Sequence, residues 1–209
     1  MSMYLSRVAL DTAKRATMRA LSSPSIFHGA VESSFAGERL RNLWRIDKLN
    51  GQMYFLLLSS REPDLKEFNV QFGYDGRVAE TKNYDQLLDR IAIGGKWRFR
   101  LTANPTKAVK SADGSRGKVV AHITNEYAAK WLLEKAEKNG FLLQEDSFEI
   151  VESSWQRFYK KDNKHAVTLR KVTYEGILEI NDAELFKTAL INGIGRGKAY
   201  GMGMLTIMH

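Results

Sequence analysis

The 209-residue chain has no cysteine, only three prolines and only four histidines. Without cysteine it cannot form a disulfide framework, use a thiolate nucleophile or ligate a metal through sulfur. The histidines do not have the H-E-x-x-H spacing of zinc hydrolases, and no carboxylate cluster indicates a two-metal nuclease. The sequence therefore predicts no metal site and no cofactor. A Ser-His-Asp triad does not follow from the spacing either.

Long hydrophobic runs are also missing. The longest near the middle covers residues 53–58, which is far too short to cross a bilayer, and the first seven residues lack the apolar core of a signal peptide. We therefore expect a cytoplasmic protein with no membrane partner.

Acidic residues are outnumbered, since 24 Asp and Glu stand against 32 Lys and Arg, for a net charge of +8. Basic residues concentrate at 96–118 and at 155–171, and no acid follows Arg196. Either patch alone could be a solvated surface. Aromatic residues lie between the charges, namely Trp97, Phe99, Trp155, Phe158 and Tyr159, and this combination favours RNA or DNA as the partner.

The order of the predicted elements indicates an α+β protein with two tandem ferredoxin-like domains. In the first domain, residues 1–105, we expect strands at 3–9, 43–49, 52–59 and 97–103 and helices at 24–35 and 84–93. Asn50-Gly51 is typical of a type I′ hairpin turn. Residues 106–117 form the predicted linker.

In the second domain, residues 118–209, the predicted strands are 118–122, 147–159, 166–180 and 204–208. The helices are 125–139 and one that is capped by Asn181 or Asp182 and ends at Asn192-Gly193. The two halves share little sequence, so the duplication rests on element order alone.

The most unusual segment is glycine-rich, GIGRGKAYGMG at 193–203. It fits neither the dinucleotide pattern nor the P-loop, because Ala199 stands where a P-loop has Ser or Thr. Glycines interspersed with Arg196 and Lys198 suit a close approach to phosphate groups. The alternative is a tight helix-to-strand connection.

Among the histidines, His28 is of most interest, because it follows Pro24 and three serines on the first predicted helix, where a helix N-terminus can also receive an anion. His122 and His165 are interpreted as structural or surface groups, which is the usual role of a lone histidine.

Several segments together resemble the CasE family of CRISPR-associated endoribonucleases, the repeat-processing subunit of type I-E Cascade. They are MYLSRV at 3–8, FHG at 27–29, RLTANPTK at 100–107, YEGIL at 174–178, GIG at 193–195 and YGMGML at 200–205. The resemblance spans almost the whole chain. It implies two ferredoxin-like domains, in agreement with the element order.

The resemblance also implies metal-independent cleavage of precursor CRISPR RNA at the base of the repeat hairpin, by attack of a ribose 2′-hydroxyl that leaves a 2′,3′-cyclic phosphate. The family's histidine matches His28, which can act as base toward the 2′-hydroxyl or as acid toward the leaving 5′-oxygen. The family commonly has a tyrosine three residues earlier, where this chain has Ser25. A serine can bind a phosphate but supplies no phenol.

For RNA binding, the segment 155–171 resembles the family's hairpin that docks along the RNA stem, where shape and phosphate contacts dominate. Arg157 is also a candidate to face the scissile phosphate, and the glycine-rich loop resembles an RNA-binding loop of the wider nuclease superfamily. The expected contacts are Arg157, Lys160, Lys161, Lys164, Arg170, Arg196 and Lys198. After cleavage we expect the protein to stay on the mature crRNA beside other Cascade subunits.

Two other functions remain open. The serine at position 25 allows a catalytically weak subunit that only binds the RNA hairpin. The basic surface also allows a scaffold that binds an acidic protein.

Overall fold

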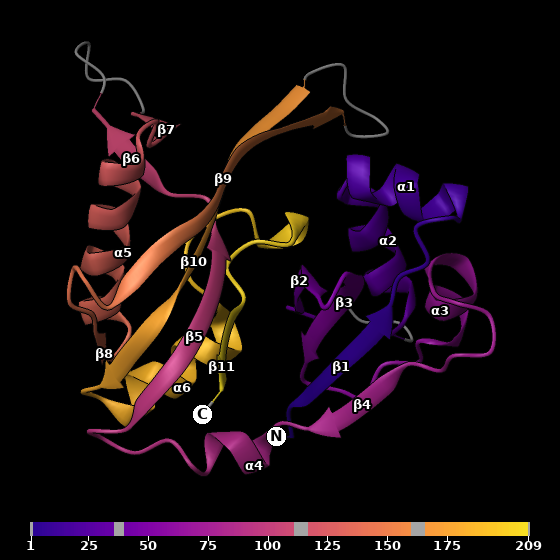
Figure 1. The fold of residues 1–209 in the computed structure, drawn as a ribbon, viewed down its shortest axis with the longest axis horizontal. Coiled ribbons are helices and arrows are strands. Elements are labelled where there is room, and N and C mark those ends of the chain that lie inside the picture. Colours follow the sequence, from indigo (N-terminus) through magenta and orange to yellow (C-terminus); the bar gives the residue numbers. More distant parts are fainter. Residues whose placement is uncertain (1, 36–39, 111–116, 160–165, 209) are drawn as a thin grey trace. The chain divides into compact units, whose positions relative to one another are not determined.

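The computed structural model describes residues 2–35, 40–110, 117–159 and 166–208. It is a mixed α+β fold with several antiparallel sheets (Figure 1), which confirms the predicted class at that level. The chain divides into two compact units. The first comprises Met1–Arg90, Phe158–Ala166 and Lys198–Gly201; the second comprises Ile91–Arg157, Val167–Gly197 and Met202–His209.

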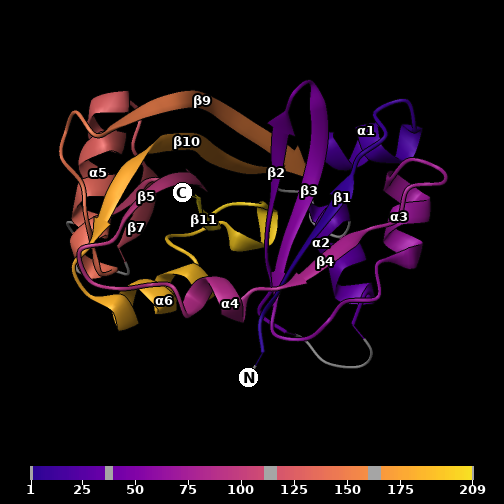
Figure 2. The ribbon, with the colours of Figure 1, turned by 60° about the horizontal axis from the view of Figure 1, so that its bottom comes forward.

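The first unit is a four-stranded sheet, and the helices at residues 15–33 and 66–72 cover one face of it (Figure 2). The strand order is β2-β3-β1-β4, and the neighbouring strands run antiparallel. Its elements are β1 (Tyr4–Ala9), α1 (Arg15–Ser22), α2 (Ser25–Ser33), β2 (Leu43–Leu49), β3 (Gln52–Ser59), α3 (Lys66–Phe72), β4 (Glu80–Asn83), α4 (Asp85–Leu88) and the short 3-10 helix η1 (Lys198–Tyr200).

The second unit has a sheet of order β11-β5-β10-β8, with β9 also paired to β10. Its elements are β5 (Lys96–Ala103), β6 (Thr106–Val109), β7 (Lys118–Ala121), α5 (Asn125–Lys138), β8 (Phe141–Leu142), β9 (Phe148–Tyr159), β10 (Ala166–Ile180), α6 (Ala183–Asn192) and β11 (Leu205–Met208). The last two residues of β9 and the first of β10 belong to the first unit.

Elements with strong local signals form as predicted. Asn50 and Gly51 have φ of 49° and 80°, as a type I′ turn between β2 and β3 requires. The Thr124 side chain caps α5, and the carboxylate of Asp182 accepts hydrogen bonds from the first turn of α6. Gly140 and Gly193, which follow these helices, have positive φ.

The expectation that residues 97–103 form the last strand of the first sheet is wrong. These residues form β5, which pairs with β10 and β11 in the second sheet. The fourth strand of the first sheet is instead β4, which follows the unpredicted helix α3. The predicted helix 84–93 shrinks to the single turn of α4. Residues 118–121 do not open the second sheet, because β7 pairs with β6.

The segment 106–117 was predicted as the linker. Residues 106–109 form β6, and 111–116 lie outside the described residues. A domain boundary at 106–117 therefore stays a prediction. The compact units described above instead divide this part of the chain between Arg90 and Ile91.

The core of the first unit lies between its sheet and helices and is rich in aromatic rings. Phe27 of α2 is fully buried against Phe55, Phe68 and Phe72, with ring centroids 5.0–6.0 Å apart. Trp44 of β2 extends this cluster, 5.8 Å from Phe27. Aromatic pairs at such distances contribute beyond the area that they bury, so α2 is fixed on the sheet by Phe27.

Gly201, in the glycine-rich segment, packs closely on this core. It has φ of 79°, and a Cβ there would lie 2.5 Å from the Trp44 ring. Gly201→Ala should lower the free energy of unfolding by about 2 to 4 kcal/mol, from backbone strain plus overpacking. Denaturant titration measures this loss.

The matched control is Gly76→Ala, because Gly76 has φ of 78° and open space around its Cβ position. It should cost only the backbone term, about 1 kcal/mol. Equal losses in the two variants would contradict the close packing of Gly201 on Trp44.

Candidate functional site

The candidate catalytic pair Ser25 and His28 lies on one face of α2, since residues three apart are neighbours on a helix. Phe27 points into the core, and His28 is left half-exposed at the surface. The side-chain direction of His28 is therefore a consequence of the packing of its neighbour.

His28 has an acidic neighbour one turn along the helix. Its Nε2 lies 3.6 Å from a carboxylate oxygen of Glu32, and both side chains are about two-fifths exposed. This carboxylate can orient the imidazole. Ser25 Oγ lies 3.1 Å from Ser23 Oγ, so two hydroxyl groups adjoin the start of the helix. Together these residues can move a proton and donate hydrogen bonds to an anion.

The 3-10 helix η1 packs against α2 and β2, which brings Lys198 into the same unit as His28. Burial, and secondarily repulsion from Arg41, lowers the pKa of the Lys198 ammonium below its ordinary value. Perturbed pKa values concentrate at functional sites, so Lys198 is a candidate site residue.

The glycine-rich segment does connect a helix to a strand, as the plainer interpretation held, with positive φ at Gly193, Gly195, Gly197, Gly201 and Gly203. Its two ends are tied together, because the amide of Ile194 donates to the carbonyl of Gly203. Arg196 is exposed on this segment. Its RNA contact remains a prediction.

Two of the other predicted RNA contacts, Arg157 and Arg170, are on β9 and β10. Arg157 is exposed on β9 in the second unit. Arg170 of β10 lies over the Trp155 ring, 5.3 Å from its centroid, and donates to Ser153 Oγ at 2.5 Å. Lys160, Lys161 and Lys164 lie outside the described residues, as does His165.

Asn104, to which the sequence pattern assigns no role, contacts two of the predicted RNA-binding residues. It is buried, its Oδ1 accepts a hydrogen bond from the Arg170 amide, and its backbone forms a β-bridge with Arg196. Asn104 therefore connects the backbone at Arg170 of β10 with the backbone at Arg196 of the glycine-rich segment, both within the second unit. The only sequence signal was its place in the RLTANPTK segment.

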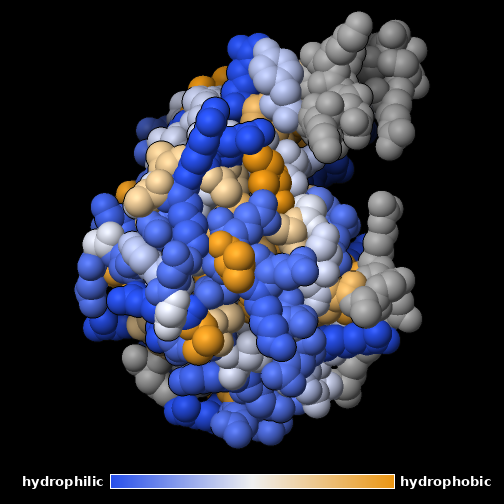
Figure 3. All heavy atoms as spheres, turned by 90° about the vertical axis from the view of Figure 1, so that its right-hand side faces the viewer, coloured by the Kyte–Doolittle hydropathy of each residue, from blue (hydrophilic) through white to orange (hydrophobic). Residues whose placement is uncertain are grey.

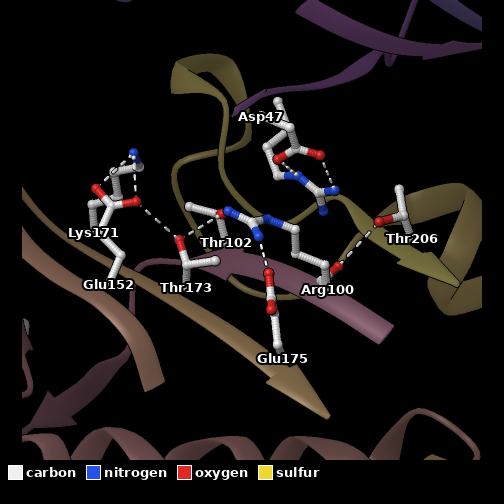
Figure 4. A network of polar contacts seen from close by, with 9 residues as sticks. Asp47, Arg100, Thr102, Glu152, Lys171, Thr173, Glu175 and Thr206 are labelled. Carbon is white, nitrogen blue, oxygen red and sulfur yellow. Dashed lines mark hydrogen bonds and ion pairs between the residues drawn. The ribbon is translucent and has the colours of Figure 1, made fainter. Parts of the chain in front are cut away.

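A polar network holds the central strands of the second sheet in register (Figure 4). Arg100 of β5 is ion-paired with Glu175 of β10, and Thr102 hydrogen-bonds Thr173 across the same strands at 2.9 Å. Lys171 pairs with Glu152 of β9 at 3.0 Å. Opposite charges on facing strands favour this pairing, which places Arg170 beside β9.

Within the described ranges, no three His, Asp or Glu side chains gather as a metal site would require. In the same part of the chain, no helix is both long and apolar enough to cross a membrane.

Comparison with known proteins agrees with the sequence resemblance. Residues 3–209 match the family model described as CRISPR associated protein. The chain is 32% identical to the CRISPR-associated endoribonuclease Cse3 of Thermus thermophilus, over 98% of this chain and 99% of that protein. The chain belongs to the Cse3/CasE family of CRISPR-associated endoribonucleases.

Two further relatives are informative. The Cascade subunit CasE of Escherichia coli is 29% identical over 66% of this chain and 71% of that protein. The structure of Thermus thermophilus Cse3 bound to an RNA representing a pre-cleavage complex matches with a TM-score of 0.83 and 27% identity, and all of both chains is covered.

His122 gives a testable contrast with His28. It stacks on Tyr127, with ring centroids 5.9 Å apart, and burial followed by repulsion from Lys107 lowers its pKa below 6.5. The unfolded state then binds a proton more readily, so stability falls as the pH drops through 6.5 toward the folded pKa. His122→Gln should remove that component of the pH dependence, which we expect to be under about 1 kcal/mol because the ring is partly solvated.

Denaturant titrations from pH 7.5 to pH 5 would measure this difference between wild type and variant. Parallel pH profiles for the two proteins would show that His122 does not resist protonation in the fold.

Proposed function

We propose that this protein is a metal-independent endoribonuclease that binds precursor CRISPR RNA and cleaves it at the base of the repeat hairpin. The observation that carries the proposal is the placement of His28, held at the surface of α2 by the buried Phe27 beside Glu32 and Ser25. Membership of an endoribonuclease family and the likeness to an RNA-bound Cse3 support it.

The proposed reaction needs proton transfer and charge stabilisation. A ribose 2′-oxygen attacks the adjacent phosphorus, loses its proton and forms the 2′,3′-cyclic phosphate, while the P–O5′ bond breaks and the 5′-oxygen takes up a proton. His28 supplies one of these two proton transfers. The hydroxyl of Ser25 and the cations Arg157 and Lys198 are candidates to stabilise the charge on the phosphate oxygens.

We further propose that each unit is a ferredoxin-like domain. In the first unit the order β1, helices, β2, β3, α3, β4 accompanies the sheet order β2-β3-β1-β4. In the second, β5, α5, β8, β10, α6 and β11 follow the same plan with sheet order β11-β5-β10-β8. The repeated order supports a duplicated βαββαβ arrangement, with β5 as the first strand of the second copy.

The proposed partners are the repeat hairpin, the mature crRNA and other subunits of a cytoplasmic Cascade complex. The name of the Escherichia coli relative as a Cascade subunit supports this assembly. The segment 155–171 has six basic residues and one acid, and the glycine-rich segment has Arg196 and Lys198 and no acid, which supports contact with RNA phosphates.

The decisive experiment compares wild type with His28→Ala on the host's own repeat hairpin in the presence of EDTA. Loss of a general acid or base should slow single-turnover cleavage by at least about 100-fold, with hairpin affinity retained. The wild-type product should end in a cyclic phosphate, and the control variant His122→Ala should cleave normally.

Unchanged cleavage by His28→Ala would contradict this site, and a requirement for metal would contradict the metal-independent mechanism. Tight binding by both proteins without cleavage would favour the second candidate, a hairpin-binding structural subunit. The specific observation behind that candidate is Ser25, which replaces the tyrosine common in the family.

The lysines of the basic segment 155–171 of the protein allow a separate test of RNA binding. Replacing Lys160, Lys161 and Lys164 with Ala should weaken binding of stem RNA and lower the slope of log affinity against log salt by about 2 to 3, because fewer counterions are released. Binding titrations over a salt series measure both quantities.

A charge-matched control replaces the exposed Lys48, Lys66 and Lys82 of the first unit. If the Lys160, Lys161 and Lys164 variant and this control both have the RNA affinity and salt slope of wild type, the protein segment 155–171 is a solvated surface rather than an RNA contact.

A further inference from the structure

Helix α1, which the sequence analysis did not predict, has a sharply divided surface. Thr17 and Ala20 are buried, and Thr17 Oγ1 donates to the carbonyl of Phe72 at 3.0 Å. The opposite side has exposed residues at helical spacing, Arg15, Met18, Arg19 and Ser22. The buried side fixes the helix, so the exposed side is a rigid surface.

This exposed side lines an open groove of about 730 Å³ within the first unit. The groove continues along Ser23 and Ser25 at the start of α2 and includes Gln71 and Tyr159. Ser25 is one turn before His28, so the groove leads to the candidate catalytic histidine.

The groove is positively charged, since Arg15 and Arg19 line it and no carboxylate does. Among the described residues neither arginine forms an ion pair. In contrast, Arg7 is paired with Glu80 at 2.9 Å and Lys14 with Asp75 at 2.7 Å. The two guanidinium groups of the groove are therefore available to an external anion, and their planar fork matches a phosphate.

The groove also has apolar and aromatic surface. Met18 is 50% exposed and Tyr159 is 59% exposed. By comparison, the face of the molecule drawn in Figure 3 is mostly hydrophilic, with small hydrophobic patches. In an RNA duplex the faces of the bases are stacked on one another, so an aromatic side chain cannot stack on them. Unpaired nucleotides expose base faces, and aromatic residues beside a basic groove are the usual means of binding them.

We propose that this groove binds unpaired RNA next to the repeat hairpin, with Arg15 and Arg19 on its phosphates and the Tyr159 ring stacked on a base. The inference rests on the proposed function and adds a second recognition surface to it, beside the stem contacts proposed for Lys160, Lys161 and Lys164. Binding in the groove directs the RNA that flanks the stem toward Ser25 and His28.

The test uses two repeat RNAs with a 2′-deoxy nucleotide at the cleavage position, one with its unpaired flanks and one reduced to the hairpin. Arg15→Gln/Arg19→Gln should bind the flanked RNA about tenfold more weakly, with the salt slope lower by about 1.4, and should bind the bare hairpin like wild type. Tyr159→Leu should lose about tenfold on the flanked RNA alone, and Tyr159→Phe should keep the affinity.

Lys48→Gln/Lys82→Gln is the control, because it removes the same charge from exposed positions that do not line the groove. Equal losses on both RNAs, or none on either, would overturn the inference. Failure of wild type to bind or cleave any repeat RNA would instead overturn the proposed function.

Discussion

The packing of Phe27 among aromatic rings is the interaction on which the candidate site depends. The ring is fully buried against side chains of β3 and α3, and against Trp44 of β2. Because protein interiors are close-packed, such a residue has one orientation, and the residue that follows it in a helix must point elsewhere. His28 is that residue, so a hydrophobic contact positions the group proposed to transfer a proton.

The same core fixes segments that are distant in sequence. Gly201 lies against the Trp44 ring, and Tyr200 contacts Phe158 with ring centroids 4.9 Å apart. The first compact unit thus contains the end of β9 and part of the glycine-rich segment besides Met1–Arg90. Lys198 and the aromatic end of β9 consequently belong to the unit that contains His28.

The second unit orders its basic residues by strand pairing rather than by an aromatic core. Asn104 ties the Arg170 amide and the Arg196 backbone to one buried side chain, and the Arg100–Glu175 pair links the neighbouring strands. Positive charges that are held by such contacts lose less conformational entropy on binding RNA than free surface lysines do.

The sequence by itself determined the elements whose signals are local. The Asn50-Gly51 turn, the caps of α5 and α6, the strand of residues 166–180 and His28 on an early helix all follow from neighbouring residues. The family also followed, from short motifs in order along the chain. These features depend on backbone preference and chemistry over a few positions.

Only the tertiary structure decided which sheet received each strand. The alternating pattern of β5 suits either sheet equally well, and its pairing with β10 and β11 is set by contacts with residues far along the chain. Helices α1 and α3 are short, and α3 is stabilised chiefly by burying Phe68 and Phe72. The groove beside α1 could not be read from the sequence for the same reason, since Tyr159 is brought to it by tertiary packing.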